Sequence, residues 1–394
     1  MIYLDCNATT PVDPRVVEAM VPVMCEQFAN PSSSHRAGRA VAAMVETARE
    51  RVAALVGVRR REVVFTSGAT EAANLAIRGI LAGGDPNRRR VLVAASEHHS
   101  VLGAATAASE SLVGSRVDHV RVHHDGTVDL AHLDSLLDHE VALVAVMHSN
   151  NETGVVNDIA PVAQLVHGAG AVLLSDVTQS VGKVPVRLAE WEVDLALLSA
   201  HKLYGPKGVG ALAVRVGLRS RLVAQLAGGG QERGLRSGTV NSAGVVGFGR
   251  AAELAVTEGE ADAARCRGLV AQLEAALHEG VGEMARNGPA TRLPNTTNLW
   301  FPRADADSVM TAMPGVAVSS GSACRASETD PSHVLTAMGL PRRRALESLR
   351  FSVGRMTTED EVLRAAALVT DAVEHVRLLS AREPRSPSRV ASGG

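Results

Sequence analysis

The stretch that decides how this sequence folds is the apolar run Asp194-Leu195-Ala196-Leu197-Leu198-Ser199, which leads directly into Ala200-His201-Lys202-Leu203-Tyr204-Gly205-Pro206-Lys207-Gly208. A short run of Leu and Ala with little polar alternation is typical of a strand that is buried on both faces. The Gly and Pro residues then end the strand in a turn. The stretch therefore predicts a buried strand whose carboxyl end carries Ser199, His201 and Lys202.

Lysine is scarce in this chain. Only Lys183, Lys202 and Lys207 occur, and arginine supplies the other Lys-or-Arg positions. Arginine satisfies surface charge and phosphate contacts at least as well, whereas lysine can lose its proton and act as an amine nucleophile. Lys202 is therefore a candidate Schiff-base residue. On this stretch alone, the chance placement of one lysine in a Gly/Pro turn is an equally good interpretation.

Other apolar runs share this character. Together they predict seven strands, at residues 62–66, 91–95, 117–122, 142–148, 171–175, 194–199 and 210–215. Amphipathic segments lie between most of them, and we expect helices at residues 69–80, 159–168 and 240–258. This alternation predicts an α/β fold in which helices cover a mostly parallel seven-stranded sheet, with right-handed crossovers.

The pattern changes near residue 258. A long helical stretch to residue 280 is followed by expected strands at 296–301 and 315–320. We therefore expect a large domain at residues 15–258 and a smaller α/β domain made of residues 1–14 and 259–379. The tail at residues 380–394 contains Pro, Ser and Arg and has little to bury, so we expect it to be disordered.

Composition limits the class of protein. The 394 residues suffice for roughly two domains of about 100–200 residues, and 46% of them are hydrophobic. The net charge of -2 gives no sign of nucleic-acid or membrane binding. No apolar run approaches the about 20 residues of a spanning helix and the first residues lack a signal-peptide pattern, so we expect a cytoplasmic protein. The four cysteines form no CxxC pair, and we predict neither disulfides nor a metal site.

The ends of the expected strands carry polar residues, and ligands of open α/β sheets bind beyond the carboxyl ends of strands. The strand at 62–66 ends in Ser67-Gly68-Ala69-Thr70-Glu71 before a helix. Free backbone N–H groups there favour a phosphate, although the same residues are ordinary capping chemistry. The strand at 91–95 is followed by His98, whose imidazole either stacks on a planar ring or is simply exposed.

Two further strand ends complete the set. The strand at 142–148 leads to Asn150 and Asn151, amides that loops also use to cap themselves. The strand at 171–175 leads to Asp176, a carboxylate that is costly to bury unless it meets a positive partner such as a pyridinium nitrogen. A phosphate site, a stacking imidazole, a carboxylate and Lys202 are what a pyridoxal phosphate site needs. Each has an ordinary explanation alone, and their combination predicts this cofactor.

Eight motifs spread over almost the whole chain carry a resemblance. They are YLDCNATTP (3–11), SGATE (67–71), NNETG (150–154), DVTQ (176–179), SAHK (199–202), GGGQERGLRSGT (228–239), SSGSAC (319–324) and LRFSVGR (349–355). Together they resemble the cysteine desulfurases, pyridoxal-phosphate-dependent enzymes of the class V aminotransferase family with fold type I. The SSGSAC form is similar to the IscS/NifS subgroup rather than to the SufS subgroup.

The resemblance implies a role for each candidate residue. Lys202 would hold pyridoxal 5'-phosphate and move the Cα proton of the substrate, Asp176 would keep the ring nitrogen protonated, and His98 would stack on the ring and shuttle a proton. The other implied contacts are Gln179 and Asn151 to the ring hydroxyl or substrate, Ala69, Thr70, Ser199 and His201 to the phosphate, Thr239 from the second subunit of a homodimer, and Arg350 to the carboxylate of L-cysteine.

Cys324 would set the reaction type. Its thiolate would take the substrate sulfur as a persulfide, leave L-alanine, and pass the sulfur to an acceptor or scaffold protein. Iron–sulfur cluster assembly, tRNA thiolation and DNA phosphorothioation all use such enzymes. Small polar neighbours and Arg325 suit a mobile cysteine loop and the anion.

Three alternatives stay open. A selenocysteine lyase or another class V enzyme would not need Cys324, a sulfur-carrier scaffold would not need the lysine chemistry, and a DNA-binding regulator would need an additional module. We expect no direct nucleic-acid binding.

Overall fold

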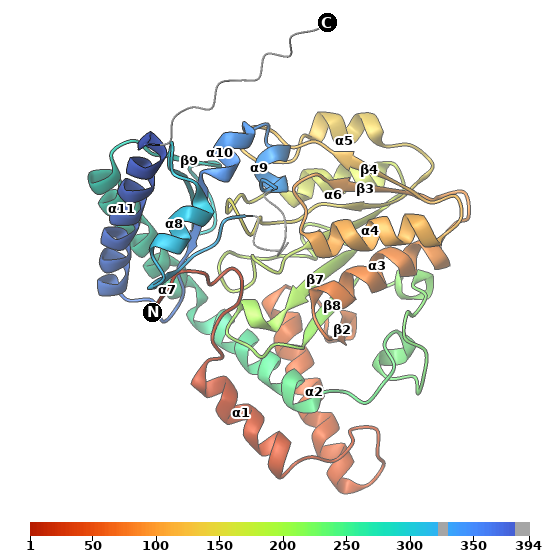
Figure 1. The fold of residues 1–394 in the computed structure, drawn as a ribbon. Coiled ribbons are helices and arrows are strands. Elements are labelled where there is room, and N and C mark those ends of the chain that lie inside the picture. The colour runs from red at the N-terminus through yellow and green to blue at the C-terminus, as the bar shows by residue number, and fades with distance from the viewer. Residues whose placement is uncertain (322–329, 383–394) are drawn as a thin grey trace, which may run out of the picture.

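Seven strands form the central sheet in the computed structural model of the chain, which describes residues 1–321 and 330–382. Across the sheet they are β2 (Val63–Thr66), β8 (Gly210–Val214), β7 (Leu195–Ser199), β6 (Val172–Asp176), β5 (Val141–Ala145), β3 (Arg90–Ala94) and β4 (Arg116–Val120). Strand β8 is antiparallel to β2 and β7, and the other neighbouring pairs are parallel. The predicted mostly parallel seven-stranded sheet is confirmed (Figure 1).

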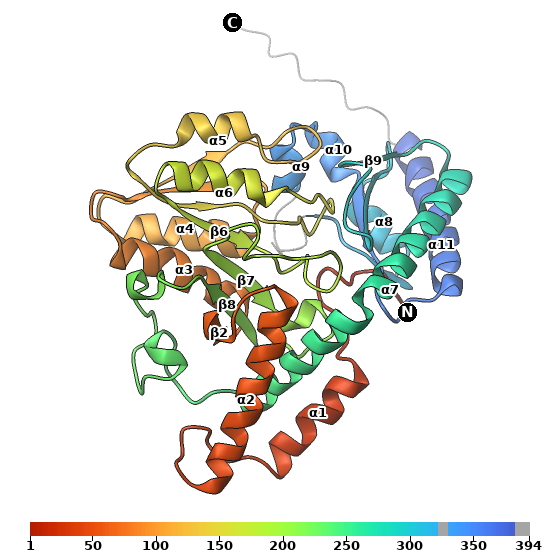
Figure 2. The same ribbon diagram turned by 180° about the vertical axis from the view of Figure 1, so that it is seen from behind.

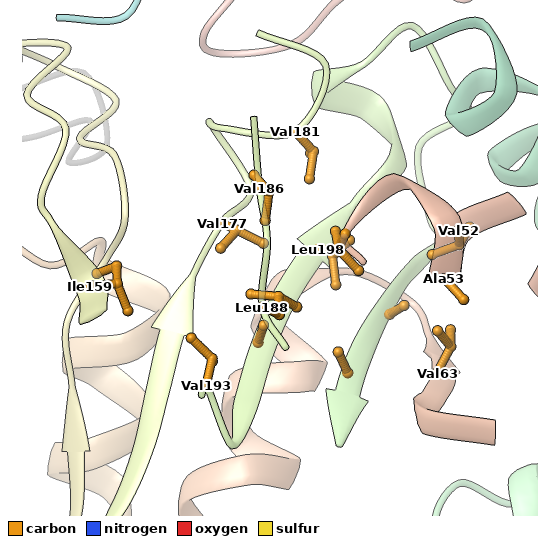
Figure 3. Close-up of a cluster of buried hydrophobic side chains, with 14 of the residues drawn as sticks. Val52, Ala53, Val63, Ile159, Val177, Val181, Val186, Leu188, Val193 and Leu198 are labelled. Carbon is orange, nitrogen blue, oxygen red and sulfur yellow. The ribbon is translucent and has the colours of Figure 1, made fainter. Parts of the chain in front are cut away.

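Helices cover both faces of this sheet, because its strands present apolar side chains in both directions. In β7, Leu195 and Leu197 pack into a core with α3 (Ala69–Gly83) and α4 (His99–Ser111). Ala196 and Leu198 face the opposite core, which is closed by α2 (Arg36–Leu55), α5 (Leu130–Leu136), α6 (Ile159–Gly168) and the first part of α7 (Ser242–Val281). Figure 3 shows part of this second core. The uniform hydrophobicity of β7 is thus the mark of a strand between two layers.

Helix α7 runs without a break through residue 258. The expected helix at 240–258 and the helical stretch to 280 form this single helix of 40 residues. Its first part packs on the central sheet, and its second part, from Cys266 to Val281, packs in a separate core. The change of composition therefore marks a change of packing partner and not a helix end, and the division into domains at this residue stays a prediction.

The separate core is built around a three-stranded antiparallel sheet of β12 (Ser348–Ser352), β10 (Thr296–Trp300) and β9 (Ala285–Arg286). The helices α8 (Ala306–Ala312) and α11 (Glu359–Arg382) pack there with the end of α7. The strand β1 (Ile2–Tyr3) pairs with β11 (Val316–Ala317), and Ile2 is buried in the same core. The start of the chain therefore lies beside its last helix (Figure 2).

The remaining α-helices of the described residues are α1 (Pro14–Cys25), α9 (His333–Ala337) and α10 (Arg342–Leu346). Helix α11 includes residues 380–382 of the expected tail. The predicted cysteine loop with Cys324 and the rest of the tail lie outside the described residues.

Neither a membrane-spanning helix nor a metal site is found among the described residues. In residues 1–321 and 330–382, no helix is long and apolar enough to cross a membrane. The same residues contain no group of three or more His, Cys, Asp or Glu side chains that could hold a metal ion. Cys6, Cys25 and Cys266 are free thiols.

Candidate active site

The segments that follow five strands line one cavity of about 490 Å³. These segments follow β2, β3, β5, β6 and β7, and the cavity therefore lies at the carboxyl edge of the parallel strands, as expected for an α/β sheet. Nine of the predicted site residues line it: Ala69, Thr70, His98, Asn151, Asp176, Gln179, Ser199, His201 and Lys202. Ala8 and Thr9 of the N-terminal segment, which the sequence analysis did not single out as site residues, complete the wall.

The N-terminus of α3 forms one end of the cavity. Its N-cap residue is Gly68, which has no side chain to accept a hydrogen bond from the first backbone N–H groups of the helix. A Cβ on Gly210 would approach the Cα of Gly68 to 2.7 Å, so the turn lies tightly against β8. Thr70 and Ser199 add hydroxyl groups to the wall beside these N–H groups. Free N–H groups and hydroxyls at a helix N-terminus suit a phosphate group.

His201 also lines the cavity, and its imidazole is neutral at physiological pH. Burial, followed by the positive charge of Lys202, lowers the pKa of its imidazole to about 4. Its Nδ1 is 3.1 Å from Oγ1 of Thr9. His201 can therefore offer a phosphate a neutral hydrogen bond rather than a positive charge.

Lys202 ends the short 3₁₀ helix at Ala200–Lys202 that follows β7. Its Nζ donates to the backbone carbonyl oxygens of Asn7 and Ala8, each at 2.7 Å. The N-terminal segment thus crosses the site and holds the amine at the cavity wall. The sequence predicts Lys202 in the site but not the two carbonyl groups that hold its amine.

Asp176 lies at the end of β6 and is 7% exposed. Its Oδ1 accepts a hydrogen bond from the backbone N–H of Thr178 at 2.8 Å. Among residues 1–321 and 330–382, no Lys or Arg forms an ion pair with it. Two other carboxyl groups lie nearby. Glu71 lines the cavity and pairs with Arg236 at 2.9 Å, and burial followed by the charge of Asp176 raises the pKa of Glu97 well above its usual value. Asp176 is therefore the carboxyl group of the cavity wall that can meet a positive group of a ligand.

His98 is the N-cap of α4, and this position fixes its tautomer. Its Nδ1 accepts from the backbone N–H of Ser100 at 3.1 Å. Burial, as the largest cause, lowers the pKa of the imidazole. The neutral ring therefore carries its proton on Nε2, since Nδ1 is the acceptor.

Gln179 is held from both ends of its amide. Its Nε2 donates to the carbonyl oxygen of Asn7 at 2.9 Å, and its Oε1 accepts from Nζ of Lys183 at 2.6 Å. Asn7 and Lys183 were not among the predicted site residues. The signals were present, because Asn7 belongs to a quoted motif and Lys183 is one of three lysines, but only the fold brings them together.

The other three predicted site residues are not among the described residues that line this cavity. Arg350 lies on β12, where its Nη1 donates to the carbonyl oxygen of Asn151 at 3.1 Å and its Nη2 pairs with Asp5 at 2.5 Å. It therefore lies behind a lining residue. Thr239 is exposed and does not line the cavity of its own chain. Cys324 lies outside the described residues.

These residues fit pyridoxal 5'-phosphate. The uncapped helix N-terminus suits the phosphate, Asp176 suits a protonated ring nitrogen, Gln179 and Asn151 offer amides to the ring substituents, and Lys202 offers an amine to the aldehyde. The fold and this set of groups define a fold type I protein of the class that uses this cofactor.

Comparisons with known proteins agree with that class. Residues 2–364 match the aminotransferase class-V family. A cysteine desulfurase of Frankia sp. (strain EuIK1) is 54% identical, with 98% of this chain and 94% of that protein covered. The cysteine desulfurase IscS of Anaeromyxobacter sp. (strain Fw109-5) is 46% identical, with 96% and 94% covered. A solved NifS-like protein superimposes with a TM-score of 0.88 at 35% identity, covering 95% of this chain and 99% of that one. The chain belongs to the class-V aminotransferases and, within them, to the cysteine desulfurases.

Proposed function

We propose that this protein is a pyridoxal-phosphate-dependent cysteine desulfurase that converts L-cysteine to L-alanine and transfers the sulfur to Cys324. The observation that carries the proposal is that one cavity is lined by Lys202, by Asp176, which has no ion pair among the described residues, and by an uncapped helix N-terminus. The bound cofactor would supply an electron sink for the substrate's Cα carbanion.

The chain's own residues would then do four things. The Nζ of Lys202 attaches the cofactor and later carries the Cα proton of the substrate. Asp176 holds the proton on the ring nitrogen, because an unpaired buried carboxylate favours a positive partner. His98, with its proton on Nε2, faces the cavity as a donor. Cys324, as thiolate, attacks the substrate sulfur, so that the carbon–sulfur bond breaks and a persulfide forms on Cys324.

Arg350 is the proposed site for the substrate carboxylate. In the structure Asp5 already occupies Nη2 of its guanidinium, and the Asn151 carbonyl occupies Nη1. A guanidinium binds carboxylates through two parallel hydrogen bonds. The Nε of Arg350 is buried and has no hydrogen-bond partner among the described residues, so the substrate carboxylate would take Nε and share or replace the Asp5 contact at Nη2.

A homodimer is the proposed assembly. Thr239 is exposed and lies away from its own cavity, which supports a role in the cavity of a second copy. The acceptor would be a sulfur-acceptor or scaffold protein of iron–sulfur cluster assembly, tRNA thiolation or DNA phosphorothioation, and the cytoplasm stays the predicted compartment. Sedimentation of the loaded protein tests the dimer, because a monomer that keeps full activity excludes a shared site.

The test of the reaction uses Cys324→Ser with Cys25→Ser as its matched control. Cys25 is an exposed free thiol at the end of α1. Loaded wild type and Cys25→Ser should release sulfide and alanine from L-cysteine in the presence of a thiol reductant. Cys324→Ser should keep the cofactor absorbance and release no sulfide. Sulfide release by Cys324→Ser at the wild-type rate would exclude the persulfide mechanism and favour another class V reaction, such as that of a selenocysteine lyase.

A further inference from the structure

Lys183 is a lysine that the proposed mechanism does not use, although it lies beside the site. Its Nζ is 2.6 Å from Oε1 of Gln179 and 3.5 Å from Oδ1 of Asn7. In the part of the chain that the structure describes, no carboxylate lies within ion-pair distance of it. Burial and the neighbouring charge of Lys202 lower its pKa to about 7. A buried cation without a counter-ion costs stability, so it is a candidate for a functional role.

The geometry of the turn after β6 explains how Lys183 reaches Gln179. Residues 177–184 form successive turns, with the N–H of Val184 bonded to the carbonyl oxygen of Ser180. Gln179 and Lys183 are four residues apart and therefore lie on the same side of these turns. The side chain of Lys183 approaches Gln179 from a small cavity of about 30 Å³ that Lys202 and Cys266 also line. Lys183 lines this small cavity and Gln179 lines the cofactor cavity, so their hydrogen bond joins the walls of the two.

The hydrogen bonds decide which way the Gln179 amide points. In the structure the Nζ of Lys183 donates to the amide oxygen of Gln179, and the amine keeps N–H groups for this bond whether it is protonated or neutral. The amide nitrogen then faces the N-terminal segment, where it donates to the Asn7 carbonyl that also receives Nζ of Lys202. Without Lys183, Oε1 would be a buried acceptor with no donor, and such a loss is costly enough to move the side chain.

We propose that Lys183 is a positioning residue: its amine anchors the oxygen of Gln179 and so keeps the Gln179 amide nitrogen directed at the cofactor cavity and at the carbonyl that holds Lys202. This inference rests on the proposed function, because the ring oxygen of the bound cofactor is the group that Gln179 would meet. The charged and titratable groups that act on Lys183 are Lys202, Cys6, Cys266 and Arg350.

The test follows the absorbance of the bound cofactor as the pH is varied. Lys183→Met releases the oxygen of Gln179, so that the Gln179 amide nitrogen is no longer held toward the ring oxygen. The loss of this donor raises the pKa of the bound chromophore, by about one unit. Gln179→Met should shift it in the same direction. The double variant should titrate within about 0.3 units of Gln179→Met, because both changes remove the same contact. Arg187→Met, which removes an exposed cation further along the same segment, should titrate as wild type.

Two results would overturn the inference: Lys183→Met titrates as wild type, or its shift adds in full to that of Gln179→Met. A wild type without cofactor absorbance would instead contradict the proposed function. Should Lys183→Met not fold, amine labelling of the loaded Gln179→Met protein gives a second measurement. Lys183 should react faster there than in wild type, relative to the exposed Lys207. Equal labelling would overturn the inference as well.

Discussion

The two edges of the central sheet carry similar residues and differ in how these are satisfied. At the amino edge, a cavity of about 380 Å³ is lined by residues that include Glu62, Asp194 and Arg215. There Asp194 accepts from the backbone N–H of Leu173 at 2.9 Å and pairs with His167 at 2.8 Å and Arg215 at 3.3 Å. At the carboxyl edge, Asp176 has one hydrogen bond, from a backbone N–H, and no ion pair among the described residues.

This difference distinguishes polar groups that stabilise the fold from polar groups that are placed to bind a ligand. Buried polar groups are normally hydrogen-bonded, and a site that leaves them unpaired gives up stability. At the amino edge, the charged side chains form ion pairs with one another. The carboxyl edge has, in one cavity that Lys202 also lines, an uncapped helix end and a carboxylate without an ion pair among the described residues. Cavity size alone does not distinguish the edges, whereas the state of their hydrogen bonds does.

The largest expected effect is at Lys202. Lys202→Ala removes the amine that would attach the cofactor, so cofactor absorbance and sulfide release should both fall below detection. The carbonyls of Asn7 and Ala8 would lose their donor but lie beside the open cavity, where water can replace it. Absorption spectra and a sulfide assay check this. A Lys202→Ala protein that keeps the wild-type absorption spectrum would show that the cofactor is not attached at the carboxyl edge of the sheet.

The second-largest effect is expected at Asp176, and Asp194 provides the matching substitution at the amino edge. Asp176→Asn keeps the size of the side chain and removes the charge that holds the ring proton, and kcat should fall by a factor of about 100 or more. The cofactor should stay bound, because the phosphate end and Lys202 are unchanged. Steady-state kinetics and the cofactor content of the purified protein measure both. A kcat within a factor of two of wild type would show that Asp176 does not face a positive group.

Asp194→Asn is the matched variant at the amino edge and should have the opposite profile. The substitution replaces an ionised acceptor of three donors with a neutral amide, and the free energy of unfolding should fall by about 1–3 kcal/mol. Activity per folded molecule should not change. Urea unfolding and kinetics distinguish the two effects. Loss of kcat without loss of stability would mean that the amino edge also has a catalytic role.

Much of the carboxyl edge could be predicted from the sequence, because strands and the residues that follow them are local features. Seven apolar runs gave seven strands, and the residues after five of them line one cavity. The continuity of helix α7 could not be predicted in the same way, because the change of composition near residue 258 reflects a change of core and not a break in the helix.

The contacts of Lys202 could not be predicted from the sequence. Asn7 and Lys202 are 195 residues apart, and their contact depends on the N-terminal segment joining the core of α11 before it crosses the cavity. No periodicity encodes such a crossing. The same holds for Lys183, whose partner Gln179 is close in sequence but whose burial depends on the packing of α7 against the turn after β6.

The smallest expected effect concerns a satisfied residue at the carboxyl edge, His148. Its Nδ1 is 2.7 Å from Oγ of Ser180, its ring lies on Trp191, and burial lowers its pKa to about 4. The unfolded state, with an ordinary histidine pKa near 6.5, binds more protons between pH 6.5 and 4, so acidification through that range destabilises the fold.

His148→Asn should reduce the slope of unfolding free energy against pH by up to about 1.4 kcal/mol per pH unit. His119→Asn, at an exposed position of β4, should leave the slope unchanged. Equal slopes in all three proteins would show that the fold does not lower the pKa of His148, so that its imidazole gains a positive charge at the carboxyl edge on acidification without loss of stability.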